Sequence, residues 1–177
     1  TNTWYNQTRL GTQPVAKLMD IYARFPFFDE HRAHQFWPTC QRLQGLINPA
    51  GPQGGFLWSN LVKMDENGRR PSHDFEEAVC ALGLLPKEIE IVHPQVLVFF
   101  TGPNYDERLD KTFPGLVRRR LDDIPERQIA RLRYNGFPAA AYRTYHPNYF
   151  MRPHVRKKIA VIDLIAKDAR ATLAAKK

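Results

Sequence analysis

The sequence predicts an α/β fold, a three-layer α/β/α sandwich around a short, mostly parallel, four-stranded sheet. Apolar runs rich in β-branched and aromatic residues alternate along the chain with segments of helical periodicity. Such alternation is typical of βαβ units, which place helices on both faces of a parallel sheet. The run QVLVFFTG at 95–102 is continuously apolar, as expected for a strand covered on both faces.

Length and composition are those of one soluble domain spanning residues 1–177. The chain is 43% hydrophobic, enough for a core, and its 25% of charged residues does not indicate disorder. Its apolar runs are far shorter than the roughly 20 residues of a membrane helix, and its polar start is not a signal peptide. Two cysteines, Cys40 and Cys80, are too few for a disulfide framework and predict reduced thiols. We therefore expect a cytoplasmic protein with no membrane contact.

The first third of the chain predicts two helices and one strand. Pro14 is a favoured first-turn residue, and apolar residues spaced along one face follow it. Asp29 is suited to cap a second helix over 29–46. Residues 49–55 hold prolines and glycines and predict a loop. The run FLWSNLV at 56–62 predicts a buried strand.

The remaining elements follow from caps, prolines and apolar patterns. Residues 111–128 are basic and irregular, and Asn135-Gly136 separates two β-rich runs. The predicted elements are a helix capped by Ser72 or Asp74, a helix from residue 86, a strand over 95–102, a helix from residue 104, strands over 129–134 and 139–145, and a helix over 152–175.

The charge is distributed unevenly. The net charge is +8, and residues 111–177 carry 16 Lys and Arg against 5 Asp and Glu. Three basic groups interleave with Tyr134, Tyr142 and Tyr145, and such interleaving suits phosphates and stacked bases. The alternative is a solubilising basic surface without a partner. The groups are Arg118-Arg119-Arg120, Arg127 with Arg131 and Arg133, and Arg156-Lys157-Lys158.

Two polar residues stand at predicted strand ends, where ligands of α/β sheets bind. Asn60, inside an apolar run, would present a buried amide in a fixed plane that suits the edge of a nucleobase. His146 precedes a proline and is suited to donate to an anion that develops during reaction. The alternatives are an asparagine bonded to nearby backbone and a turn histidine.

The late loop adds further candidates. Asn148 and Arg152 are suited to touch phosphate. Tyr149 or Phe150 would enter a base stack as the apolar wedge that unstacks a duplex. The chain has no glycine-rich phosphate loop of the Walker or dinucleotide type and no nucleophile elbow.

The order of these features resembles the uracil-DNA glycosylase superfamily. GGFLWSNLVKMD is similar to its asparagine-bearing strand, HPQVLVFFTGPNYDERL to the following strand–helix unit, and YRTYHPNYFMR to its late histidine loop. The resemblance implies that Asn60 reads the base and that His146 stabilises the departing base anion. TNTWY resembles the tail of the family's first motif, so that Thr1 and Asn2 would line the base pocket. The acidic, water-positioning residue would then precede Thr1, on a short missing segment.

The leading hypothesis is a DNA glycosylase-like enzyme that flips a damaged or modified base and cleaves its N-glycosidic bond. It needs no metal and no cofactor, and its partner is DNA, single-stranded or damaged. A non-catalytic nucleic-acid-binding module on the same fold is the second hypothesis. The third is an α/β enzyme that acts on a small metabolite, with the positive charge incidental.

Overall fold

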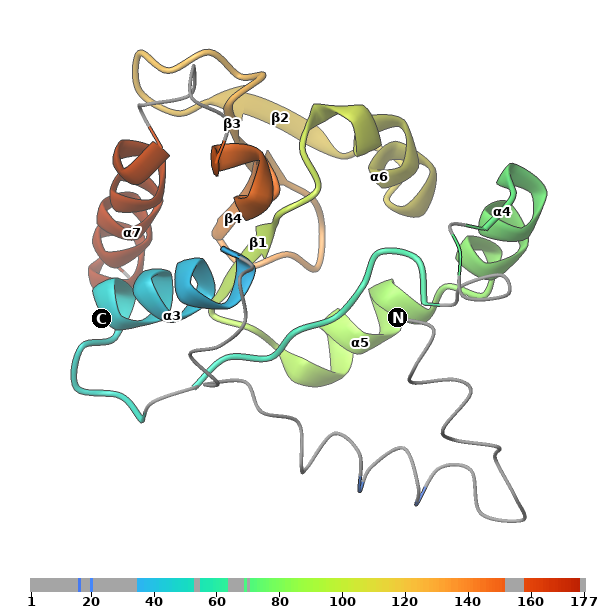
Figure 1. Cartoon of the computed structure of the whole chain (residues 1–177), viewed down its shortest axis with the longest axis horizontal. Helices are drawn as coiled ribbons and strands as arrows, with labels where there is room; N and C mark the ends of the chain where they lie inside the picture. Colours follow the sequence, from blue (N-terminus) through green and yellow to red (C-terminus); the bar gives the residue numbers. More distant parts are fainter. Residues whose placement is uncertain are drawn as a thin grey trace. The chain divides into compact units, whose positions relative to one another are not determined.

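The computed structural model describes residues 16, 20, 35–52, 55–63, 69, 71–151 and 158–175. The chain divides into two compact units. The first comprises Thr1–Arg32 and Trp58–Leu84, and the second comprises Ala33–Leu57 and Leu85–Lys177. Figure 1 gives the element labels used below. The single domain over residues 1–177 stays a prediction.

The described part of the first unit contains one complete helix, α4 (His73–Ala81). Its N-cap residue is Ser72, as predicted, although the Ser72 side chain makes no capping hydrogen bond. Asp74 and Glu76 lie in its first turn, where acidic side chains interact favourably with the helix dipole. The strand predicted over 56–62 is wrong, because these residues have no regular secondary structure.

The second unit is built on a four-stranded sheet with the order β1-β4-β3-β2. The prediction of a mostly parallel sheet is wrong, because only β1 and β4 pair in parallel and the other two pairs are antiparallel. Connection length explains this, since a parallel pair needs a crossover of a dozen or more residues. The loops that join β2 to β3 and β3 to β4 are shorter than that. The strands are β1 (Val96–Phe99), β2 (Val117–Arg120), β3 (Ile129–Arg133) and β4 (Ala140–Thr144).

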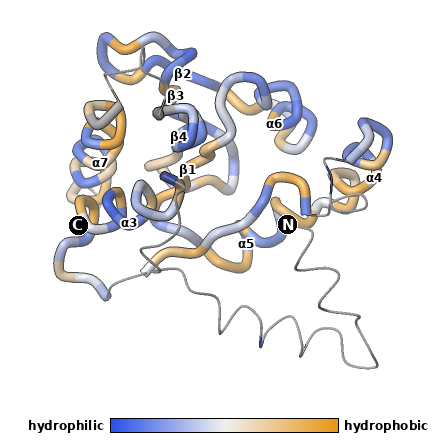
Figure 2. Tube along the Cα trace, in the orientation of Figure 1, coloured by the Kyte–Doolittle hydropathy of each residue, from blue (hydrophilic) through white to orange (hydrophobic). Residues whose placement is uncertain are grey.

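Two helices, α3 (Phe36–Ile47) and α7 (Lys158–Ala174), form the core with one face of this sheet. The buried residues of α7 recur at helical spacing, which produces the apolar stripe that packs on the strands. They are Val161, Ile162, Ile165, Ala166 and Ala169. An ion pair of 2.8 Å between Arg42 and Asp163 links the two helices. Figure 2 shows hydrophobic stretches on α7 and on the strands it covers.

The opposite face of the sheet packs against α6 (Asp106–Thr112) and an aromatic cluster. The 3-10 helix η1 (Pro103–Tyr105) precedes α6, whose Leu109 is fully buried. Phe113 is the centre of the cluster, and its ring contacts Phe99, Tyr134 and Phe137 at centroid distances of 4.8–6.0 Å. The mixed α/β character is therefore confirmed.

The helix predicted over 29–46 with Asp29 as its cap is α3, which begins at Phe36 with Gln35 as its N-cap residue. The helix predicted after Pro14 falls on a segment of which only residues 16 and 20 are described.

Other predicted elements are found close to their expected positions. The helix expected from residue 86 is α5 (Leu84–Val92), and the one expected from residue 104 is η1 followed by α6. Strands β1, β3 and β4 fall inside their predicted ranges, and α7 falls inside 152–175. The fourth strand, β2, lies instead in the segment that was predicted to be irregular.

Candidate functional site

The carboxyl ends of the parallel strands β1 and β4 form the best candidate site. Parallel strands of α/β sheets bind ligands at this edge. The loops that leave the two strands meet there, since the Gly102 N–H donates to the Thr144 carbonyl at 2.9 Å. Gly102 has a φ of 69°, and a β-carbon on it would lie 3.3 Å from the Tyr145 ring. A glycine is therefore needed where the two loops cross.

His146 lies at this edge with an exposed side chain, immediately before the 3-10 helix η2 (Pro147–Met151). The backbone N–H of Asn148 donates to its Nδ1 at 3.2 Å, and the N–H of Tyr149 donates to its carbonyl at 2.8 Å. A ring nitrogen that accepts a hydrogen bond carries no proton, so the proton of the neutral imidazole is on Nε2. The loop therefore fixes a tautomer in which Nε2 is a hydrogen-bond donor.

Aromatic rings surround this histidine. Phe36, the first residue of α3, stacks on the imidazole with a centroid distance of 5.3 Å and an interplanar angle of 20°. Phe36 also contacts Phe100 edge-on at 6.0 Å. Tyr145 and Tyr149 form a second stacked pair at 4.4 Å. Stacked rings of this kind suit a planar ligand such as a nucleobase.

Sequence reasoning missed the contribution of Phe36. Phe36 falls within the helix predicted over 29–46, and it is half-buried there. Nothing in the pattern indicates that the ring stacks on a histidine 110 positions later. Asn148 is exposed, and it contributes its backbone N–H to the described site.

Asn60 differs from its prediction. Asn60 is exposed, and its segment is not a strand. The prediction of a buried amide in a strand is therefore wrong. Asn60 belongs to the first compact unit and His146 to the second. Convergence of the two side chains on one cleft therefore stays a prediction.

Other predicted residues lie at the limits of what the structure describes. Thr1, Asn2 and Arg152 are outside the described residues, as are Arg156 and Lys157. Phe150 belongs to η2 by its backbone, and its side chain is outside the described part.

A buried ionic network lies behind the candidate site. Arg143, the fourth residue of β4, is 1% exposed, and its Nη2 bonds Asp106 Oδ2 at 2.8 Å. Its Nη1 donates to the carbonyls of Glu126 and Arg127, both at 3.0 Å. Arg118 contacts the same Asp106 carboxylate oxygen at 3.5 Å. The network ties the start of α6 to β2 and β4, and thereby holds the loop that contains Gly102.

The predicted basic groups divide into structural and exposed arginines. Arg118 pairs with Asp110 at 2.7 Å, and Arg131 pairs with Asp168 at 3.2 Å. Tyr142, expected to stack a base, is fully buried and donates to Asp168 at 2.5 Å. These side chains form intramolecular contacts, which corrects their predicted role. The exposed members of the groups are Arg119, Arg120, Arg127 and Arg133.

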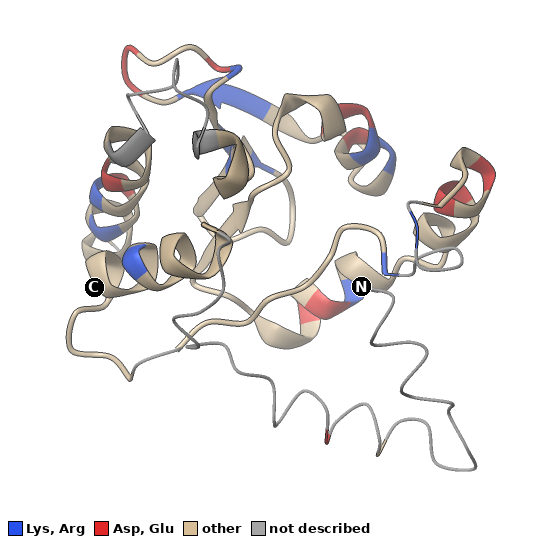
Figure 3. Ribbon diagram, in the orientation of Figure 1, with Lys and Arg blue, Asp and Glu red and all other residues tan. Residues whose placement is uncertain are grey.

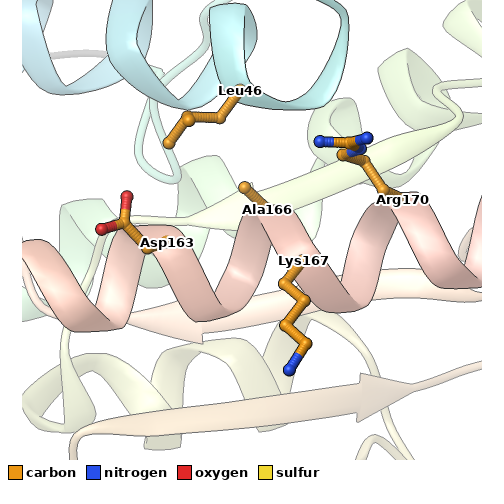
Figure 4. A pocket seen from close by; sticks show the side chains of 5 residues that line it. All are labelled: Leu46, Asp163, Ala166, Lys167 and Arg170. Atoms are coloured by element: carbon orange, nitrogen blue, oxygen red, sulfur yellow. The ribbon is translucent and has the colours of Figure 1, made fainter.

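A depression lies between α3 and α7, away from His146. It has a volume of about 440 Å³ and is lined by Leu46, Asp163, Ala166, Lys167 and Arg170 (Figure 4). Leu46 lies ten residues beyond Phe36 on α3, or about 15 Å along the helix axis. In Figure 4 the Lys167 side chain points away from Leu46. The depression therefore belongs to a different end of the helix pair from the candidate site.

The residues described by the structure contain no cluster of three or more His, Cys, Asp or Glu side chains that could hold a metal ion. Within the same residues, no helix combines the length and the apolar character that crossing a membrane requires. Comparison of the chain with models of protein families, with curated proteins and with solved structures finds no match. The function is therefore argued from the site itself.

Proposed function

We propose that this chain is a DNA glycosylase-like protein that accepts an extruded base at the carboxyl ends of β1 and β4 and hydrolyses its N-glycosidic bond. A three-layer arrangement of helices about the sheet and a cytoplasmic location belong to this proposal. Helices on both faces of the sheet are consistent with the first, and the unpaired thiols of Cys40 and Cys80 with the second.

The hydrogen bond from the Asn148 N–H to Nδ1 of His146 is the observation that carries the proposal. The Asn148 N–H occupies Nδ1, so Nε2 presents a proton to an acceptor. When the bond between the base and C1′ breaks, its electron pair leaves with the base, and a donor aimed at the developing charge lowers the barrier. Water then supplies the hydroxyl to C1′ and a proton to the base.

The aromatic surroundings support a base as the group that is bound. A flipped base is read by stacking between aromatic side chains and by hydrogen bonds to its edge. The Phe36–His146 and Tyr145–Tyr149 stacks provide the rings. Edge contacts from the amide of Asn60, and Tyr149 or Phe150 as the wedge, stay predictions from the sequence.

The test is base release from oligonucleotides that carry uracil or modified pyrimidines. His146→Ala is expected to lower the rate by about 10²–10³-fold, as removal of one transition-state donor does in other enzymes. His93→Ala is the matched control, because His93 is also exposed and also precedes a proline. Asn60→Ala tests whether the amide takes part in the same step.

Other outcomes separate the rival functions. If the wild type binds DNA in a salt-dependent way but releases no base, the second hypothesis, a non-catalytic nucleic-acid-binding module, is favoured over the enzyme. The exposed position of Asn60 favours that alternative. If the wild type binds no nucleic acid at low salt, the third hypothesis, an enzyme that acts on a small metabolite, is favoured.

A further inference from the structure

The pairing of β2 with β3 places three arginines on one face of the sheet. Arg119 stands directly opposite Arg131, and Val117 stands opposite Arg133. Residues that are directly paired share a face, so Arg133 is the diagonal neighbour of Arg119. Figure 3 shows the concentration of basic residues along β2.

Only one of these three positive charges is neutralised within the described part of the chain. Arg131 bonds Asp168 at 3.2 Å and Thr172 at 2.9 Å, both on α7. Arg119 and Arg133 are exposed, and no described carboxylate lies within ion-pair distance of either. Like charges on paired strands destabilise a sheet. A bound anion would remove that cost.

Protection of a sheet edge explains only part of this arrangement. Charged side chains on an edge strand discourage pairing with another chain, and β2 is an edge strand. Edge protection therefore accounts for Arg119. It does not account for Arg133, because β3 lies between β2 and β4.

We propose that Arg119 and Arg133 form a binding surface for the phosphodiester backbone of nucleic acid. Diagonal neighbours in an antiparallel pair lie about 7–8 Å apart, so two phosphates of one strand can each meet a guanidinium. Val117, which is 47% exposed, provides an apolar contact beside them. The inference rests on the proposed function for its choice of nucleic acid as the partner.

This surface is separate from the candidate site. In the strand register, Arg119 of β2 stands opposite Arg131 of β3, and Arg131 stands opposite Tyr142 of β4. His146 lies four residues beyond Tyr142 along the chain. The two places are therefore about 13 Å apart along the strands and about 10 Å apart across them. Loss of the arginines should lower affinity for an oligonucleotide without changing base release at saturation.

The experiment measures binding of the full chain to a fluorescent 20-nucleotide DNA over a range of salt concentrations. Two phosphate contacts contribute about 1.4–1.8 to the slope of log affinity against log salt concentration. The double variant Arg119→Gln/Arg133→Gln is expected to lose that part of the slope and to bind at least tenfold more weakly at low salt. Lys167→Gln/Arg170→Gln is the control, since it removes the same charge from exposed positions on α7.

The results distinguish this surface from bulk charge and from the proposed enzyme. Equal losses in both double variants, or no loss in the arginine variant, overturn the inference. A wild-type chain that binds no DNA at low salt also overturns it. Wild-type binding that depends on the two arginines, without any base release, supports the surface and refutes the enzyme. Thermal melting of each variant checks that the fold is intact.

Discussion

Strands β4 and β2 belong to one sheet, yet they use arginine in opposite ways. All five residues of β4 are buried, and its Arg143 is enclosed by a carboxylate and two carbonyls. Strand β2 has three arginines at the sheet edge, of which Arg119 and Arg120 are exposed. The comparison shows that burial of the side chain, and the face of the strand on which it lies, decide whether an arginine supports the fold or stays exposed.

The physical reason is the cost of removing charge from water. A guanidinium in a central strand is stable there only with nearby partners, and the two terminal nitrogens of Arg143 bond Asp106 and carbonyls of the turn before β3. An arginine whose side chain stays exposed on an edge strand remains hydrated and needs no partner for folding. The charge of Arg119 is therefore compatible with binding, whereas the charges of Arg143 on β4 and of the largely buried Arg118 on β2 are structural.

Breaking the Arg143–Asp106 pair should have the largest effect. Arg143→Gln leaves the partly exposed Asp106 carboxylate without its closest partner, and the expected cost is about 3 kcal/mol, the lower end of the range for a buried pair. Urea denaturation of the full chain measures this loss in the free energy of unfolding. Arg119→Gln is the control and should change stability by less than about 0.5 kcal/mol. Similar losses in both variants would refute the distinction between the two strands.

Tyr142→Phe tests the buried side of the comparison without removing a formal charge. It deletes the hydrogen bond to Asp168, and bonds to charged groups contribute about 1.5–3 kcal/mol. Burial, together with the nearby Asp168 carboxylate, raises the pKa of Tyr142 above the ordinary value for tyrosine. The folded state therefore keeps a proton that the unfolded state releases near pH 10.

The sign of the pH dependence follows from this raised pKa. The contribution of Tyr142 to stability is complete below about pH 10 and falls as the pH rises further, because ionisation favours the unfolded chain. The advantage of the wild type over Tyr142→Phe should shrink by up to about 1.4 kcal/mol per pH unit above 10. Denaturation at pH 8, 10 and 11 measures it. An advantage that stays constant over this range would contradict the assignment.

Most helices and three of the four strands could be predicted because apolar periodicity determines them. Strand β2 could not, since VRRR has a single apolar residue, and its place depends on backbone pairing with β3. FLWSNLV was predicted as a strand on composition alone, and a short apolar run does not specify its partner. The packing and pairing partners in the folded chain decide whether such a segment becomes a strand.

The sequence contained a signal of antiparallel pairing that the α/β interpretation did not use. Asn135-Gly136 between two β-rich runs favours a short antiparallel connection, and Gly136 has a φ of 94°. The position of His146 at a strand end could be read from the sequence, as the run before it is a confirmed strand. The Arg143–Asp106 pair spans 37 residues, and no local pattern predicts it.

Neighbouring arginines on β2 give the finest test of the comparison. Arg118 is 14% exposed and bonds Asp110 at 2.7 Å and the Asp106 carbonyl at 3.0 Å. Successive residues of a strand point to opposite faces, so Arg118 meets α6 while Arg119 does not. Arg118→Gln should therefore cost about 1 kcal/mol, between the values for Arg143→Gln and Arg119→Gln. Urea denaturation would contradict this order by showing a larger loss in the free energy of unfolding for Arg119→Gln than for Arg118→Gln. In that case the exposed arginines support the fold, and the proposal that they bind phosphate is wrong.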